Sequence, residues 1–202
     1  MRETPELYAA AHVPRIAAIP ASNLAWISNV LAKEKEVDRL LLDVPGDDGF
    51  LLNTDPKWTS HPTSTDRSTW KHHASVKDLY CLGLVRTRIA SIRDLRARHL
   101  PLLRAMREQG LSVIESSYGV PHHQIRAFFH YPPQFYHLHV HFTSLTTDMG
   151  SGCHIERAHL LDDVIDNLAQ DGEFYARSNI TIRLGEKDPL WANIQAAQEA
   201  TS

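Results

Sequence analysis

The chain has 202 residues, 43% of them hydrophobic, and a formal net charge of −3 at pH 7. This length and apolar content suffice for one domain with a single core. The slightly acidic charge argues against sequence-independent nucleic-acid binding, which depends on a basic surface, but a small nucleotide needs only a few local cations. No apolar run approaches the roughly 20 residues of a membrane span, so we expect a soluble protein with no membrane partner.

The cysteine content favours a reducing compartment. No secretory leader is visible ahead of Cys81 and Cys153, so we expect both residues to be free thiols. We therefore expect a cytoplasmic protein, one that can also be nuclear.

The first half of the chain predicts one helix and three strands. Ser22 and Asn23 can cap a helix that carries Trp26, Ile27 and Val30 on its apolar side. Short apolar runs predict strands at 39–43, 50–53 and 79–86, the first two separated by a Pro- and Gly-rich turn. Residues 59–75 are polar and predict a mobile loop.

The second half alternates helices and strands. The longest helical pattern covers 95–118, with Gly110 as its weak point. Strands are predicted at 125–130 and 136–145, then a helix at 158–168, a strand at 180–184 and a helix at 190–200. Hairpin-length connections with inserted helices predict an α+β fold, an antiparallel sheet with flanking helices. We find no internal repeat and no second domain.

One predicted strand carries the most informative pattern, His137-Leu138-His139-Val140-His141-Phe142. Strand side chains alternate between faces, so three imidazoles share one face while the apolar residues fill the other. Such a face is either exposed to solvent or part of a functional site. Imidazoles act as metal ligands, as acids and bases, or as nucleophiles. Three interpretations follow: a solvated strand, a zinc site that needs further ligands, or a histidine triad whose central imidazole attacks phosphorus.

The surrounding segments favour the triad, because together with it they closely resemble the scavenger mRNA decapping enzymes. This family consists of histidine-triad pyrophosphatases that act on short 7-methylguanosine-capped fragments. The resemblance covers nearly the whole chain and is carried by residues 26–31, 55–58, 88–95, 99–103, 130–136 and 156–161. It implies a histidine-triad fold, no cofactor and no metal. It also implies that 1–202 form a single catalytic domain, without the N-terminal swapped lid domain of the family.

The resemblance assigns the catalytic roles. His139 is expected to be the nucleophile, forming a nucleotidyl-histidine that water hydrolyses to 7-methylguanosine monophosphate. His137 and His141 are expected to donate to phosphate oxygens and to fix the attacking tautomer.

The resemblance also assigns the substrate-binding residues. His130 and Lys57 are expected to contact phosphates, and Asp55 to accept a hydrogen bond from the ligand. Trp26 and Glu36 form the expected specificity pair, because an aromatic face attracts the cationic methylated base and a carboxylate accepts from its edge. Arg157 is a further candidate for phosphate binding.

The sequence departs from the family just before the triad. Gln134 and Phe135 stand where the family carries Ser and Tyr, so two hydroxyl donors are missing and only the amide of Gln134 replaces them. Three alternatives therefore stay open. The chain hydrolyses capped dinucleotides or short capped RNA, hydrolyses dinucleoside polyphosphates in general, or binds caps with little turnover. A homodimer is compatible with each of these.

Overall fold

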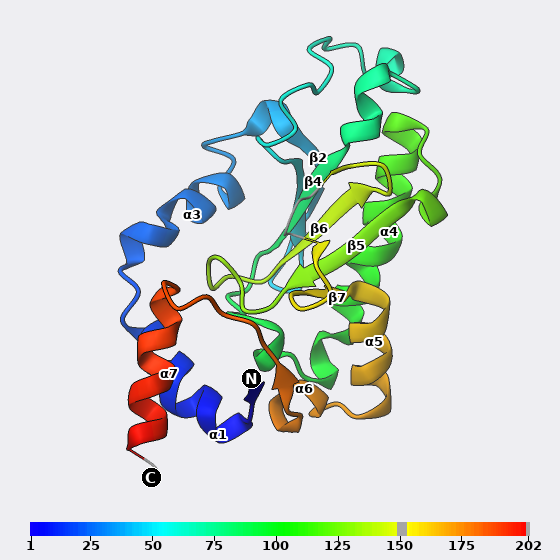
Figure 1. Cartoon of the computed structure of the whole chain (residues 1–202). Coiled ribbons are helices and arrows are strands. Elements are labelled where there is room, and N and C mark those ends of the chain that lie inside the picture. The colour runs from blue at the N-terminus through cyan, green and yellow to red at the C-terminus, as the bar shows by residue number, and fades with distance from the viewer. Residues whose placement is uncertain (149–152, 201–202) are drawn as a thin grey trace.

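A six-stranded antiparallel sheet forms the centre of the computed structural model, which describes residues 1–148 and 153–200 (Figure 1). The strand order is β2-β3-β4-β6-β5-β7. The strands are β2 (Leu40–Val44), β3 (Phe50–Thr54), β4 (Tyr80–Val85), β5 (Ile125–His130), β6 (His139–Ser144) and β7 (Ala158–Leu160). With its flanking helices this sheet confirms the predicted α+β class.

Two long helices, α4 (Leu100–Tyr118) and α5 (Leu161–Gln170), lie along one side of the sheet (Figure 1). Each buries an apolar stripe at helical spacing, as an amphipathic helix does on a sheet. The stripe of α4 contains Leu102, Leu103, Met106 and Ile114. Phe142 of β6 contacts α4. Strand side chains alternate between faces, so Val140 and Leu138 share the face of Phe142, whereas His139 and His141 point to the opposite face.

Two glycines make room for the ring of Phe142 between α4 and β4. A Cβ on Gly110 of α4 would lie 2.9 Å from Cζ of this ring, and a Cβ on Gly83 of β4 would lie 3.3 Å from Cε2. Gly110 is therefore more than the predicted weak point of a helix. It permits the close approach of the helix to the sheet at the strand that carries the triad.

The N-terminal segment was not predicted to form structure, yet it packs against the end of the chain. Strand β1 (Arg2–Glu3) pairs with β8 (Ile180–Thr181). The following turns, α1 (Pro5–Leu7), a π-helical turn (Tyr8–His12) and α2 (Val13–Ala17), lie beside α7 (Pro189–Glu199) (Figure 1). The remaining helices are α3 (Ala25–Leu31) and α6 (Phe174–Arg177).

Several predicted boundaries were wrong for local reasons. The long helix begins at Leu100 rather than at 95, because Ser91 caps a 3₁₀ turn (Ile92–Asp94) and the chain extends at Leu95. The predicted helix at 158–168 begins only at Leu161, since the first three residues pair with β5 as β7. The strand predicted at 180–184 is only the two residues of β8, and that at 136–145 begins at His139.

Two further predictions about local structure were wrong. Residues 21–24 form a 3₁₀ turn, and α3 follows Leu24 without a side-chain cap, so Ser22 and Asn23 do not cap it. Residues 59–75 are not a structureless loop. They contain a 3₁₀ turn (Arg67–Trp70), and Trp70 is buried against Tyr118 with its ring stacked at 5.6 Å.

Cys81 and Cys153 are both free, as expected. Within the described ranges, no helix combines the length and the apolar content that crossing a membrane requires.

Candidate active site

The three imidazoles of the predicted triad are buried in the middle of the sheet. Strand β6 lies between β4 and β5, with His139 opposite Leu84, and with His141 opposite both Leu82 and Phe128. His137, His139 and His141 are 6%, 4% and 5% exposed. A solvated strand face would leave them open to water, so this burial excludes that interpretation and leaves a site. His137 itself precedes the strand.

A backbone carbonyl fixes the tautomer of His139. Its Nδ1 lies 2.7 Å from the carbonyl oxygen of His137, and because a carbonyl can only accept, Nδ1 carries the proton. The lone pair of the neutral ring is then on Nε2. Burial lowers the pKa of His139 to about 4, so the ring is neutral at physiological pH. Phe135 stacks on it at 4.2 Å between ring centroids and 17° between planes.

The outer two histidines are held by different elements. Nδ1 of His141 lies 2.8 Å from the hydroxyl of Tyr80 on β4, while its buried Nε2 has no hydrogen-bond partner in the described part of the chain. Burial lowers the pKa of His141 well below its ordinary value, as it lowers the pKa of His137. Nε2 of His137 donates to the carbonyl of Val85 at 2.7 Å. His137 therefore orients His139 through its main chain, while its ring braces the end of β4.

His130 joins this cluster from the end of β5. Its ring centroid lies 4.2 Å from that of His141, so the structure brings it to the triad as the sequence predicted. One ring nitrogen each of His130, His139 and His141 lies within 4.8 Å of the others, the one such group in residues 1–148 and 153–200 with the donors for a metal ion. No carboxylate or thiolate belongs to this group, so a metal ion held here would have three imidazole ligands.

A polar cavity of about 480 Å³ opens beside His130. Four of the predicted substrate-binding residues line it, His130 together with Lys57, Gln134 and Arg157. Lys57 places its ammonium 5.8 Å from the ring centroid of Tyr80. Lys57, Arg157 and the half-buried imidazole of His130 can bind phosphate oxygens, although Asp78 and Asp148 also line this cavity. The sequence did not single out the other lining residues, which include Tyr80, Ser60 and Asp78.

A second, more apolar cavity of about 380 Å³ adjoins the first and shares Lys57 and Gln134 with it. The predicted specificity pair, Trp26 and Glu36, lines this cavity together with Asp55. Trp26 is 38% exposed, so it is not the core aromatic that an amphipathic helix would ordinarily carry.

Two residues shape the second cavity. Phe135 meets the indole of Trp26 edge to face at 5.0 Å, and its ring also stacks on His139. Asp55 accepts from the backbone N–H of Lys57 at 2.7 Å, and burial raises the pKa of this carboxyl. Nine of the ten predicted site residues thus lie in the cluster of His130, His139 and His141 or line these two cavities, whereas the ring of His137 contacts the carbonyl of Val85.

The sequence analysis missed two residues of the site. Tyr80 contacts His141 only because β4 and β6 pair in the observed register, and register is not readable from one strand alone. Phe135 was interpreted as a lost hydroxyl, whereas its ring covers the central imidazole. Its place four residues before that histidine gave no local signal for this contact.

The fold and this histidine cluster define a histidine-triad domain. The chain belongs to the family described as "Scavenger mRNA decapping enzyme C-term binding", whose model matches residues 25–155. Three curated relatives, each named m7GpppX diphosphatase, are similar to it. That of Ascaris suum is 42% identical over 95% of this chain and 59% of its own length. Those of Bos taurus and Homo sapiens are 40% and 37% identical over 99% of this chain and 56% of theirs. The chain thus spans a little over half the length of these relatives.

Proposed function

We propose that this chain hydrolyses 7-methylguanosine cap dinucleotides or short capped RNA and releases 7-methylguanosine monophosphate through an intermediate on His139. The observation that carries the proposal is the state of His139. It is a buried neutral imidazole whose N–H donates to a backbone carbonyl, beside a polar cavity that contains two cations and a more apolar cavity that contains Trp26. The relatives' name, m7GpppX diphosphatase, supports this assignment.

The reaction consists of two displacements at one phosphorus atom. The Nε2 lone pair of His139 attacks the phosphate that carries 7-methylguanosine, a P–N bond forms, and the bridging P–O bond breaks to release the remaining nucleotide with its two phosphates. Water then attacks the same phosphorus, the P–N bond breaks, and the lone pair returns to Nε2. The proton of the water passes to solvent. A neutral nucleophile avoids the repulsion that an anionic one meets from phosphate oxygens.

The charged groups around His139 suit the transition state of each step. Lys57 and Arg157 line the polar cavity, and these cations balance the negative charge on the phosphate oxygens. The imidazole of His141 has its Nε2 buried without a partner, so a phosphate oxygen can take that position if the nitrogen is protonated.

The aromatic cavity suits the methylated base. Methylation at N7 gives guanine a positive charge, which the exposed indole of Trp26 attracts, and the carboxylate of Glu36 lines the same cavity. A base in this cavity places its phosphate chain toward Lys57 and Gln134, which line both cavities.

Chromatography of the products from a methylated cap dinucleotide, incubated with the pure chain in the presence of a chelator, tests this function. We expect 7-methylguanosine monophosphate and a nucleoside diphosphate, with slower cleavage of the unmethylated dinucleotide. Equal rates for both dinucleotides would favour a general dinucleoside polyphosphate hydrolase. Tight binding without products would indicate a binding module, and activity that needs added zinc or magnesium would make the histidines a metal site.

Two expectations about the wider context remain proposals. We propose that the active species is a homodimer, which light scattering of the purified chain tests against a monomer. We propose a cytoplasmic location that extends to the nucleus, and microscopy of the tagged chain in its own cells tests it.

A further inference from the structure

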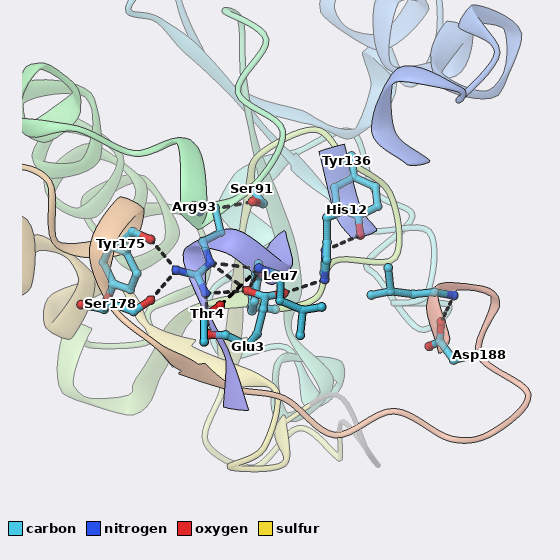
Figure 2. A network of polar contacts seen from close by, with 12 residues as sticks. Glu3, Thr4, Leu7, His12, Ser91, Arg93, Tyr136, Tyr175, Ser178 and Asp188 are labelled. Carbon is cyan, nitrogen blue, oxygen red and sulfur yellow. Dashed lines mark hydrogen bonds and ion pairs between the residues drawn. The ribbon is translucent and has the colours of Figure 1, made fainter. Parts of the chain in front are cut away.

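A buried carboxylate near the start of the chain lies at the centre of a polar network that is separate from the two cavities. Figure 2 shows Glu3 of β1 surrounded by Arg93 and His12, with Tyr136 beyond His12. Glu3, His12 and Arg93 are at most 2% exposed. The mechanism described above uses none of them. A buried ion group of this kind is costly unless its charges are paired.

Both carboxylate oxygens of Glu3 have close polar neighbours. Its Oε1 accepts from Nε and Nη2 of Arg93 at 2.8 and 2.6 Å and from the hydroxyl of Tyr131 at 2.6 Å. Its Oε2 lies 2.6 Å from Nε2 of His12, a close charge contact without hydrogen-bond geometry. Burial raises the pKa of Glu3, but the contacts with His12, Tyr131 and Arg93 outweigh this effect and the net pKa is lowered. Glu3 is therefore a carboxylate, an acceptor only.

The same carboxylate holds both ends of the segment that precedes the triad. At one end Tyr131 donates to it directly. At the other end the Tyr136 hydroxyl lies 3.2 Å from Nδ1 of His12, whose Nε2 contacts Glu3. The two ring nitrogens of His12 thereby link the Tyr136 hydroxyl to the carboxylate of Glu3. Tyr131 and Tyr136 are 0% and 5% exposed.

Between these two anchors the segment reaches the site. Gln134 is exposed and lines both cavities, and Phe135 stacks on the nucleophile. One residue beyond Tyr136, the carbonyl of His137 fixes the proton on Nδ1 of His139. Displacement of either anchor would therefore move the groups that cover and orient His139.

We propose that Glu3 and His12 are positioning residues for the nucleophile, acting through Tyr131 and Tyr136 on residues 131–137. The inference rests on the proposed function for its kinetic consequence, although its structural part does not need turnover. Arg93 completes this network, because its Nη1 donates to the carbonyls of Tyr175 and Ser178 and so connects the carboxylate to α6 and to the residue that follows it.

The variant Tyr136→Phe tests the link most gently, because it removes one hydroxyl and keeps the ring. Tyr118→Phe is the matched control. It also removes a buried hydroxyl that contacts a histidine, since Tyr118 lies 2.9 Å from Nε2 of His61, outside the network. Tyr131→Phe and Glu3→Gln extend the series. If Glu3→Gln does not fold, the two tyrosine variants decide.

Two readouts separate positioning from general stability. With cap dinucleotide as substrate, we expect Tyr136→Phe to lower kcat by about tenfold with KM within about twofold, as misplacement of a reacting group does. We also expect the pKa of the His139 imidazole, followed by NMR and assigned with His139→Asn, to rise by about half a pH unit or more as its cover loosens. The charged or titratable groups that act on His139 in the described part of the chain include His130, His137, His141 and Lys57, and the variant leaves these four in place.

The outcomes distinguish this inference from the proposed function. Lower kcat and a raised His139 pKa in Tyr136→Phe, with neither change in Tyr118→Phe, support it. The same kcat and the same His139 titration in the two variants overturn it, even if the wild-type chain hydrolyses caps. A wild-type chain without turnover contradicts the proposed function, and the imidazole titration then still decides whether the network positions His139.

Discussion

At His139 the choice of reactive nitrogen follows from one backbone contact. The carbonyl of His137 accepts a hydrogen bond from Nδ1–H, and the neutral ring presents its lone pair at Nε2. Burial keeps that ring neutral. The alternation of the sequence predicted the shared face of the three histidines, because strand alternation is a local property. The tautomer could not be predicted, since it depends on the direction of a carbonyl.

The pH dependence of turnover reports on this nitrogen. Burial lowers the pKa of His139 to about 4, so we expect kcat to lose its nucleophile only as pH falls through that value and to change little between about pH 7 and 5 on this account. The unfolded chain takes up protons at a higher pH than the folded one, so stability also declines as pH falls below about 6.5. A pH series of kcat, with fluorescence to confirm folding at each point, checks this. An acid limb near the ordinary histidine pKa would contradict it.

Base selectivity belongs to Trp26 and Glu36. We expect Trp26→Ala to weaken binding of 7-methylguanosine monophosphate by about 0.5–2 kcal/mol more than binding of guanosine monophosphate, because only the methylated base is cationic. Glu36→Ala should act in the same direction. Calorimetric titration of both ligands measures the difference, with the exposed Glu34→Ala as the control. Equal losses for the two ligands would show that the pair only supports the fold.

At the scale of elements, α4 and β6 meet at the ring of Phe142. Gly110→Ala gains about 1 kcal/mol of helix propensity, but its Cβ would lie 2.9 Å from that ring, and Gly83 limits the space on the other side. Overpacking costs about 1–3 kcal/mol, so we expect a net loss in the free energy of unfolding. Urea unfolding measures it.

The combination of Gly110→Ala with Phe142→Leu provides the control for this contact. The smaller side chain should recover part of the loss caused by the added methyl group, because contacting residues are not additive. Additive losses would show that the two residues do not conflict.

Element types were more predictable than element boundaries. The sheet strands and both long helices follow from periodicity, whereas β7 was assigned to a helix because its pairing with β5 is a tertiary contact. The same holds for the start of α4, where capping at Ser91 builds a separate 3₁₀ turn ahead of the helix.

At the scale of the whole molecule, the site depends on contacts between distant parts of the chain. The substrate-binding residues were assigned by resemblance, and the structure gathers them around two adjoining cavities. Glu3 was not predictable, because its partners Arg93 and Tyr131 lie 90 and 128 residues away. A charged residue in a buried strand can be interpreted only once its partners are known.

Mass spectrometry of the protein during turnover tests the central claim most directly. The chain is mixed with methylated cap dinucleotide in chelator, quenched within a turnover in neutral denaturant, and digested. We expect the peptide that contains His139 to gain the mass of a 7-methylguanosine monophosphoryl group on that residue, and His139→Asn to show neither this adduct nor turnover. Rapid hydrolysis by the wild-type chain with no adduct at any time, or an adduct on another residue, would contradict the account.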